Sequence, residues 1–182
     1  NREVDAETAA AMKQIFLEVI IAPGYTDEAL TILIEKKNLR LLRLNDISSP
    51  VKAGTPLFKD VSGGLLVQEA DVGLWDDMDF QRVTEKIATT EQFDDFKFAM
   101  KVVKHVRSNA IVLARDGQTV GIGPGQPNRI TSTEIAIKNA GNKCEGAVLA
   151  SDAFFPFADS VEIAHKAGIT SVIQPGGSIT DV

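Results

Sequence analysis

The second half of this chain alternates helical patterns with short apolar strands, and this alternation limits the folds that it can adopt. Apolar residues at helical spacing predict a helix from residue 90 to about 105. Asp116-Gly117 lies between two apolar runs, which is typical of a β-hairpin. Further helices and strands are expected at 131–140, 147–150, 159–167 and 169–173. Elements in this order pack with helices on both faces of a sheet, so the sequence predicts a layered α/β fold.

The first half shows a similar order of elements. A helix is expected over residues 6–19 with Asp5 as its N-cap, and a second helix is expected to begin after Thr26. A loop rich in Asp, Ser, Pro and Gly is expected over 45–62, and an acidic connector over 71–79. Strands are expected at 20–22, 39–44, 64–68 and 80–83.

Composition excludes several classes of function. The chain has 182 residues, enough for one domain or two small ones, and its 44% hydrophobic content suffices for a core. The net charge of −6 argues against general nucleic-acid binding, and no apolar run is long enough to span a bilayer, so neither nucleic acid nor a membrane is an expected partner. The single Cys144 cannot form an internal disulfide, which indicates a reducing compartment, and we expect the cytoplasm. The chain does not begin with Met and stops soon after Gly176-Gly177, so we expect a segment of a longer protein.

Three polar or glycine-rich loops each follow an apolar strand, which is typical of a ligand site in an α/β fold. They are residues 121–125, 151–160 and 174–178. In the first loop, backbone N–H groups either approach a phosphate at a helix N-terminus or form a tight turn before a helix capped by Thr131 or Ser132. Arg129 beside this loop suits bidentate oxyanion binding, with a solvated guanidinium as the alternative.

Other side chains near these loops have both a binding and a structural interpretation. Asn109 can donate and accept hydrogen bonds toward a ligand, or can occupy a turn. Phe154, with two further Phe residues around Pro156, can stack on a flat heterocycle or fill the core. Asp159 is a helix N-cap or a ligand contact. Lys104-His105 is a general acid–base pair or a pair of cations that favours the helix dipole.

Two further observations limit the chemistry of the chain. His165 lies on the polar face of its expected helix, where we expect it to be solvated. One cysteine and two distant histidines do not have metal-ligand spacing, so no metal site is expected.

Long motifs in the chain resemble a known family. The segments VKHVRSNAIVLARDGQTVGIGPGQPNR, SDAFFPFADSVEIA and QPGGS are similar to the transformylase domain of the bifunctional AICAR transformylase/IMP cyclohydrolase family, as are NREVDAET and IIAPGYTDEALTIL. The resemblance runs from end to end. It implies two tandem halves with a layered cytidine-deaminase-like α/β fold that lacks the zinc of that fold. The rear of the first half would be 1–69, the connector 70–89, and most of the second half 90–182, truncated at its C-terminus.

The resemblance also implies an activity. Members of the family transfer a formyl group from the co-substrate 10-formyltetrahydrofolate to the 5-amino group of AICAR, which gives FAICAR in de novo purine (IMP) biosynthesis. Their sites form across a homodimer interface. The family assigns proton transfer to a Lys–His pair upstream of Asn1, and Lys104-His105 occupies only the counterpart place in the second half. No catalytic residue is therefore expected in this chain, and the segment alone is expected to be inactive.

Matching motifs assign binding residues in the same way. Asn109, Arg129 and Phe154 match AICAR contacts of the family, and Glu18 falls where the family has an acidic AICAR contact. The residues that match folate contacts are Ile130, Asp159, Ser178 and Ile179. A different class stays open, in which the chain is a non-catalytic α/β ligand-binding or interaction module of the same fold.

Overall fold

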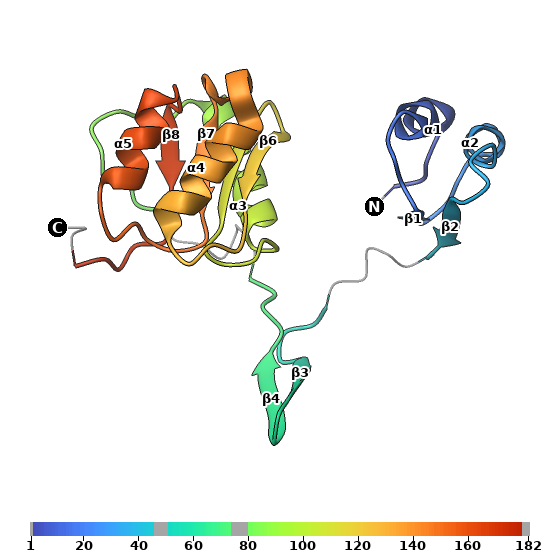
Figure 1. Cartoon of the computed structure of the whole chain (residues 1–182), viewed down its shortest axis with the longest axis horizontal. Helices are drawn as coiled ribbons and strands as arrows, with labels where there is room; N and C mark the ends of the chain where they lie inside the picture. The colour runs from blue at the N-terminus through green and yellow to red at the C-terminus, as the bar shows by residue number, and fades with distance from the viewer. Residues whose placement is uncertain (1, 46–50, 74–79, 180–182) are drawn as a thin grey trace. The chain divides into compact units, whose positions relative to one another are not determined.

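The computed structural model describes residues 2–45, 51–73 and 80–179, and the chain divides into two compact units, 1–72 and 73–182 (Figure 1). This division falls inside the segment that was expected to be a connector, 70–89. That the two units are tandem cytidine-deaminase-like halves stays a prediction. Both units mix helices with sheet, so the α/β class is confirmed.

The second unit contains a four-stranded sheet. Its strands are β5 (Ile111–Arg115), β6 (Gln118–Gly123), β7 (Val148–Ser151) and β8 (Ser171–Ile173). They lie in the order β6-β5-β7-β8, with β5 antiparallel to both neighbours and β7 parallel to β8. The hairpin predicted at Asp116-Gly117 is confirmed, and both residues have the positive φ that a tight hairpin turn requires, 54° and 69°.

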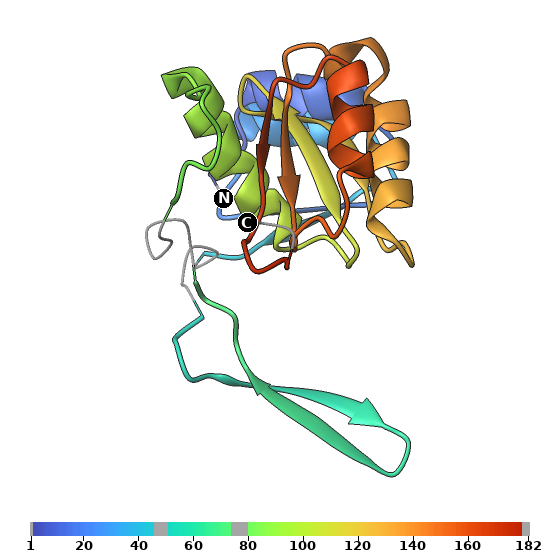
Figure 2. The same cartoon turned by 90° about the vertical axis from the view of Figure 1, so that its left-hand side faces the viewer.

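Helices cover both faces of this sheet, as the alternating pattern predicts (Figure 2). One face is covered by α3 (Thr90–Val103), and the other by α4 (Arg129–Ala140) and α5 (Asp159–Lys166). A short 3-10 helix, η2 (Gly141–Cys144), follows α4. Successive residues of β5 point to opposite faces, so that Val112 belongs to the core under α3 and Leu113 to the core under α4 and α5.

Polar side chains fix α3 to its surroundings. Its N-cap is Thr89, and Gln92 completes a capping box: Thr89 Oγ1 accepts from Gln92 N at 3.3 Å, and Gln92 Oε1 accepts from Thr89 N at 3.0 Å. Asp95 is buried and accepts hydrogen bonds from the N–H groups of Asp116-Gly117 at 3.0 and 2.8 Å. The carboxylate of Asp95 thus ties the hairpin turn to the helix.

The first unit contains two helices and a parallel pair of strands. Its elements are α1 (Ala6–Lys13), β1 (Val19–Ala22), α2 (Asp27–Leu33) and β2 (Arg40–Arg43). The predicted caps Asp5 and Thr26 are confirmed. The first helix ends at Lys13 rather than at Val19, because the β-branched run 19–21 forms β1 instead.

A hairpin of the first unit occupies part of the predicted loop. Strand β3 (Pro56–Val61) pairs antiparallel with β4 (Gly64–Glu69), and every residue of both strands is exposed. The loop predicted over 45–62 is therefore wrong for β3, where cross-strand pairs such as Phe58 with Val67 outweigh the polar composition. Residues 46–50 of that prediction lie outside the described residues.

The strand predicted over residues 80–83 is not formed. The ring of Phe80 instead packs edge-to-face on Phe93 of α3, with ring centroids 5.9 Å apart. Its apolar character therefore serves packing on a helix rather than pairing in a sheet. None of the helices in the described ranges combines the length and the apolar character that crossing a membrane requires.

Candidate functional site

The candidate site lies at one edge of the four-stranded sheet. Ile111, at the start of β5, pairs with Gly123 at the end of β6 and with Ser151 at the end of β7. Strand β8 runs parallel to β7 and ends at the same edge. The three polar loops that follow β6, β7 and β8 therefore leave the sheet together, as expected for a ligand site of an α/β fold.

The position of Arg129 is set by the cap of α4. Asn128, rather than the predicted Thr131 or Ser132, caps this helix, since its Oδ1 accepts a hydrogen bond from Thr131 N at 2.9 Å. Arg129 is consequently the first residue of α4. The sequence contained this signal, because Asn ranks above Thr as an N-cap residue.

The side chain of Arg129 is enclosed by protein rather than solvated. Its side chain is 8% exposed. Nη1 donates to Ser151 Oγ at 2.9 Å and to Asp152 Oδ1, and Nη2 donates to Asn109 Oδ1 at 2.8 Å. The structure thus brings together two of the polar residues that the sequence singled out, Asn109 and Arg129.

Asn109 joins this group to the loop after β6. Its Nδ2 donates to Gln126 O at 2.9 Å, and its main-chain carbonyl oxygen accepts from Ser132 Oγ at 2.8 Å. The peptide bond between Ser108 and Asn109 is cis. Because Nδ2 faces a carbonyl and Oδ1 faces a guanidinium, the orientation of the carboxamide is determined by its neighbours.

Asp152 is the residue of this site that sequence reasoning missed. Its Oδ1 accepts from Ala110 N at 3.0 Å and from Arg129, and its Oδ2 accepts from Ser108 Oγ. One signal was available, because a carboxylate directly after a fully buried strand needs a partner. We call Ser108, Asn109, Arg129, Ser151 and Asp152 the polar cluster.

Hydrogen bonds and charge keep Asp152 ionised. Burial alone raises the pKa of this carboxyl, but hydrogen bonds from Ser108, Ala110 and Arg129, together with the charge of Arg129, outweigh burial and lower the pKa below its ordinary value of 3.8. Among the described residues, no buried side-chain nitrogen or oxygen lacks a hydrogen-bond partner. The polar cluster therefore contains one hydrogen-bonded ion pair, and its net charge is zero.

Two of the glycines before α4 allow close packing of the strand against the helix. A Cβ on Gly121 would lie 2.1 Å from Ala136 O, and a Cβ on Gly123 would lie 1.8 Å from Ser132 O. Both glycines belong to β6, whose backbone they bring directly against α4. Only Gly125, with φ of 63°, lies in the connecting turn, where its N–H donates to Arg107 O at 2.7 Å.

The aromatic loop after β7 divides between core and solvent. Phe155 is 6% exposed and belongs to the core, whereas Phe154 and Phe157 are 40% and 71% exposed. The backbone N–H of Phe155 donates to Gln174 Oε1 at 2.5 Å, which ties this loop to the one that follows β8. Phe154 therefore offers part of an aromatic face two residues after Asp152.

The residues predicted to contact folate lie on α4, α5 and the loop after β8. Asp159 is exposed and is not an N-cap: it is the first residue of α5, which has no side-chain cap, and its Oδ1 accepts from Ser160 N at 2.6 Å. Ile130 is the second residue of α4 and is half-buried. Ser178 is half-buried and Ile179 is exposed.

The remaining residues that the sequence singled out are not members of the polar cluster. Glu18 belongs to the first unit, directly before β1, and its side chain is exposed. Lys104 closes α3 as its C-cap, and its Nζ donates to Gly73 O at 2.6 Å. His105 and His165 are exposed, as expected for His165. In the parts of the chain that the structure describes, no group of His, Cys, Asp and Glu is placed to hold a metal ion.

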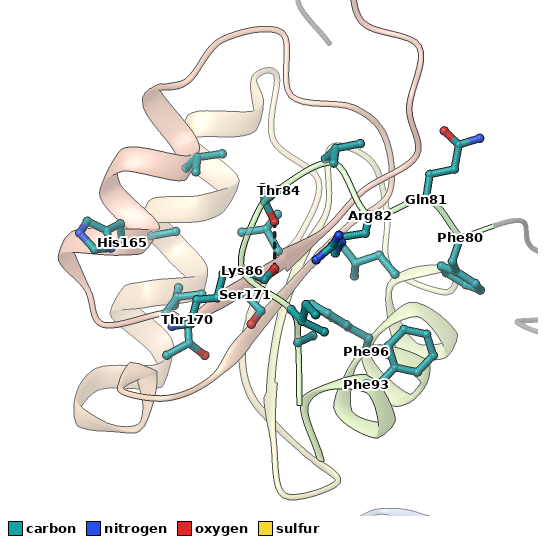
Figure 3. Close-up of a pocket in the computed structure, with 18 residues that line it drawn as sticks. Phe80, Gln81, Arg82, Thr84, Lys86, Phe93, Phe96, His165, Thr170 and Ser171 are labelled. Carbon is teal, nitrogen blue, oxygen red and sulfur yellow. Dashed lines mark hydrogen bonds between the residues drawn. The ribbon is translucent and has the colours of Figure 1, made fainter. Parts of the chain in front are cut away.

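A separate cavity of about 590 Å³ lies in the second unit, between residues 80–88, α3, α5 and β8 (Figure 3). Aromatic rings of Phe80, Phe93 and Phe96 line it, and its basic residues are Arg82, Lys86 and His165. None of the predicted AICAR or folate contacts lines this cavity.

The second unit has the features of an α/β protein that binds a small polar ligand: a covered sheet, three loops at one edge and an ordered polar cluster beneath them. A family model described as AICARFT/IMPCHase bienzyme matches residues 1–139. The chain belongs to this family.

Individual relatives are similar over the whole chain. Proteins named bifunctional purine biosynthesis protein PurH from Acetivibrio thermocellus, a Thermoanaerobacter species and Bacillus subtilis are 56%, 56% and 54% identical over 181 residues. The alignments cover 100% of this chain and 35% of each relative, so the chain spans about a third of their length. Among solved structures, a form of RibD from Acinetobacter baumannii is 19% identical with a TM-score of 0.31, over 45% of this chain and 27% of that one, which carries no argument.

Proposed function

We propose that this chain is part of a cytoplasmic AICAR transformylase, which transfers a formyl group from 10-formyltetrahydrofolate to the 5-amino group of AICAR and yields FAICAR. Membership of the family supports this function. The observation that carries it is the polar cluster, in which a guanidinium and a carboxamide are hydrogen-bonded side by side at the loop edge of the sheet. Such an arrangement suits a planar ligand with both donor and acceptor groups.

The charge of the polar cluster favours the carboxamide of AICAR over its phosphate as the group that Arg129 contacts. Asp152 compensates the charge of Arg129, so the guanidinium acts as an oriented donor rather than as a net cation. A phosphate dianion gains most from an uncompensated cation, whereas a neutral carboxamide needs only directed hydrogen bonds. The half-exposed ring of Phe154 supplies a face on which the imidazole can stack.

The loop after β7 with the first residue of α5, and the loop after β8, form the proposed folate side. Asp159, Ser178 and Ile179 combine a carboxylate, a hydroxyl and an apolar side chain, which suit the polar edge and the apolar face of a pteridine. The hydrogen bond from Phe155 to Gln174 couples the two loops. Ile130 at the start of α4 completes this proposed set, and Glu18 of the first unit is a further proposed AICAR contact.

Formyl transfer needs a base for a weakly nucleophilic amine and a donor for the tetrahedral oxyanion. We assign neither role to this chain, whose residues bind and orient the substrates. The proposal includes a homodimer as the functional form of the complete protein, in which residues of one site come from two subunits.

The test of the proposal uses the full-length protein. Arg129→Ala is expected to weaken AICAR binding, measured by calorimetry, by about 2–4 kcal/mol, because a hydrogen-bonded charged donor is lost. Arg129→Lys keeps the cation without the planar fork and serves as the matched variant, with an intermediate loss expected. Thermal melting of each variant separates lost contact from lost folding.

Two results would count against the proposal. An unchanged AICAR dissociation constant in folded Arg129→Ala would remove Arg129 from the site. AICAR binding without any tetrahydrofolate formation by the full-length protein would favour the non-catalytic binding module.

A further inference from the structure

We propose that Asp152 determines specificity at the AICAR site: by neutralising Arg129, it makes the site accept a carboxamide and discriminate against the corresponding carboxylate. This inference rests on the proposed function, because it concerns the same site. It assigns a role to a residue that the match to family motifs leaves without one.

The position of Asp152 is fixed by three hydrogen-bond donors from separate segments. Ala110 N and Ser108 Oγ come from the entry to β5, and Nη1 of Arg129 comes from the start of α4. The side chain of Asp152 is only 12% exposed, and that of Arg129 only 8%. Solvent therefore screens the electrostatic attraction between these two side chains only weakly.

The guanidinium keeps one edge for a ligand. Its hydrogen bonds to the described residues use Nη1 and Nη2, and Nε makes none to them. Because every fully buried side-chain nitrogen and oxygen in those ranges has a partner, Nε is not sealed off from solvent. A ligand that meets this edge contacts a guanidinium whose Nη1 is paired with Asp152.

The charges then decide between two ligands of the same shape. A carboxamide and a carboxylate are both planar and of similar size, but only the carboxylate carries a full negative charge. In the polar cluster, Ser108, Asn109 and Ser151 are neutral, so the carboxylate of Asp152 cancels the attraction of Arg129 for an anion. Arg107 lies near the turn at Gly125 but is exposed, where solvent and salt screen its charge.

Asp152→Asn in the full-length protein removes the charge and keeps the hydrogen bonds. An Asn at this position can still accept from Ala110 and Arg129 through its oxygen, while its amide donates to the oxygen of Ser108. The dissociation constants of AICAR and of the same ribotide with a carboxylate in place of the carboxamide are compared. We expect the preference for AICAR to fall by about tenfold or more, mainly through tighter carboxylate binding.

A control variant separates the charge of Asp152 from the general effect of neutralising a buried carboxylate. Asp95→Asn neutralises another buried carboxylate, which binds the hairpin turn and not the polar cluster, and should leave the preference unchanged. If Asp152→Asn does not fold, Asp152→Ser provides the second neutral variant with the same expectation.

The outcomes distinguish the two levels of the proposal. An unchanged preference in a folded neutral variant overturns the role of Asp152 while leaving AICAR binding intact. An equal loss of preference in Asp95→Asn would show that the charge of Asp152 at this site is not the cause, and would also overturn it. Failure of the unmutated full-length protein to bind AICAR removes the proposed function itself.

Discussion

At the scale of single residues, the carboxylate of Asp152 links the candidate site to the stability of the fold. Its pKa is lowered in the folded chain, so its contribution to stability is fully present above the ordinary value of 3.8 and is lost as the pH falls through the lower, folded-state pKa. We expect the melting temperature of Asp152→Asn to lie below that of the unmutated chain at pH 7, and the difference in melting temperature to narrow as the pH falls below 3.8. Calorimetry over this range measures the difference. A constant difference at all pH values would contradict this role.

Asp159 gives a second prediction at this scale. Replacing it with Asn is expected to raise the KM for 10-formyltetrahydrofolate roughly tenfold, since hydrogen bonds to charged groups contribute about 1.5–3 kcal/mol, and to leave the KM for AICAR nearly unchanged. Initial rates of the full-length enzyme give both constants. Glu162→Gln changes an acidic residue of the same first turn and serves as control. A larger effect on AICAR than on folate would refute the assignment.

The sequence predicted part of the polar cluster, and physical reasons explain what it left out. Asn109 and Arg129 stand out because each follows a recognisable element boundary, and the structure joins them directly. Asp152 lies 23 residues from Arg129 along the chain, and its role depends on the pairing of β5 with β7. No local pattern encodes that pairing, so the ion pair is a tertiary property.

At the scale of elements, the contact between β6 and α4 controls where Arg129 stands. Gly123→Ala would place a methyl group 1.8 Å from Ser132 O, a backbone atom that cannot rotate away. We expect a loss of about 1–3 kcal/mol or more in the free energy of unfolding, together with weaker AICAR binding as α4 is displaced. Gly64→Ala, where the added methyl meets open space, is the matched control and should change stability by less than about 0.5 kcal/mol. Denaturant titration of both variants measures the difference, and equal stabilities would disprove the packing role.

Element types were easier to predict than their ends. Periodic apolar spacing identified α3, and the Asp116-Gly117 signal identified the hairpin, because both depend on local chemistry. The start of α4 was placed too late, since competing cap residues follow one another in the sequence. Strand β3 was missed because its mixed polar and apolar residues are typical of a loop, and cross-strand pairing with β4 decides its conformation.

At the scale of the whole molecule, the chain covers 35% of its curated relatives, and substantial apolar surface is exposed in the first unit. The outward residues of β1 and β2 include Val19, Ile21 and Leu42, and the β3–β4 hairpin adds Phe58 and Leu66. Parallel strands are ordinarily covered on both faces. The mixed α/β class could be predicted from the order of helices and strands. What covers the exposed faces of β1 and β2 could not be predicted, because it depends on tertiary contacts that no local sequence pattern encodes.

The isolated 182-residue chain is expected to show no transformylase activity. The family resemblance places proton transfer in a Lys–His pair outside these residues, and the loss of general acid–base catalysis costs about 10²–10⁴ in rate. The exposed apolar surface should also make the chain self-associate. The rate of tetrahydrofolate formation from AICAR and 10-formyltetrahydrofolate is measured for the isolated chain and for the full-length protein. Light scattering of the isolated chain measures its self-association. Turnover equal to that of the full-length protein would place the catalytic group in this chain, with Lys104 and His105 as the first candidates.

The close seating of α4 on β6 has a consequence for how this family can drift in evolution. Main-chain atoms make that contact, and every amino acid carries the same main chain. Substitutions on the outward face of α4 can therefore accumulate over generations without shifting the guanidinium at its first turn. Gly121 and Gly123 cannot share this freedom, because any side chain there would lift the helix from the strand. The position of the guanidinium thus depends on two glycines, which have no side chain to contact a ligand themselves.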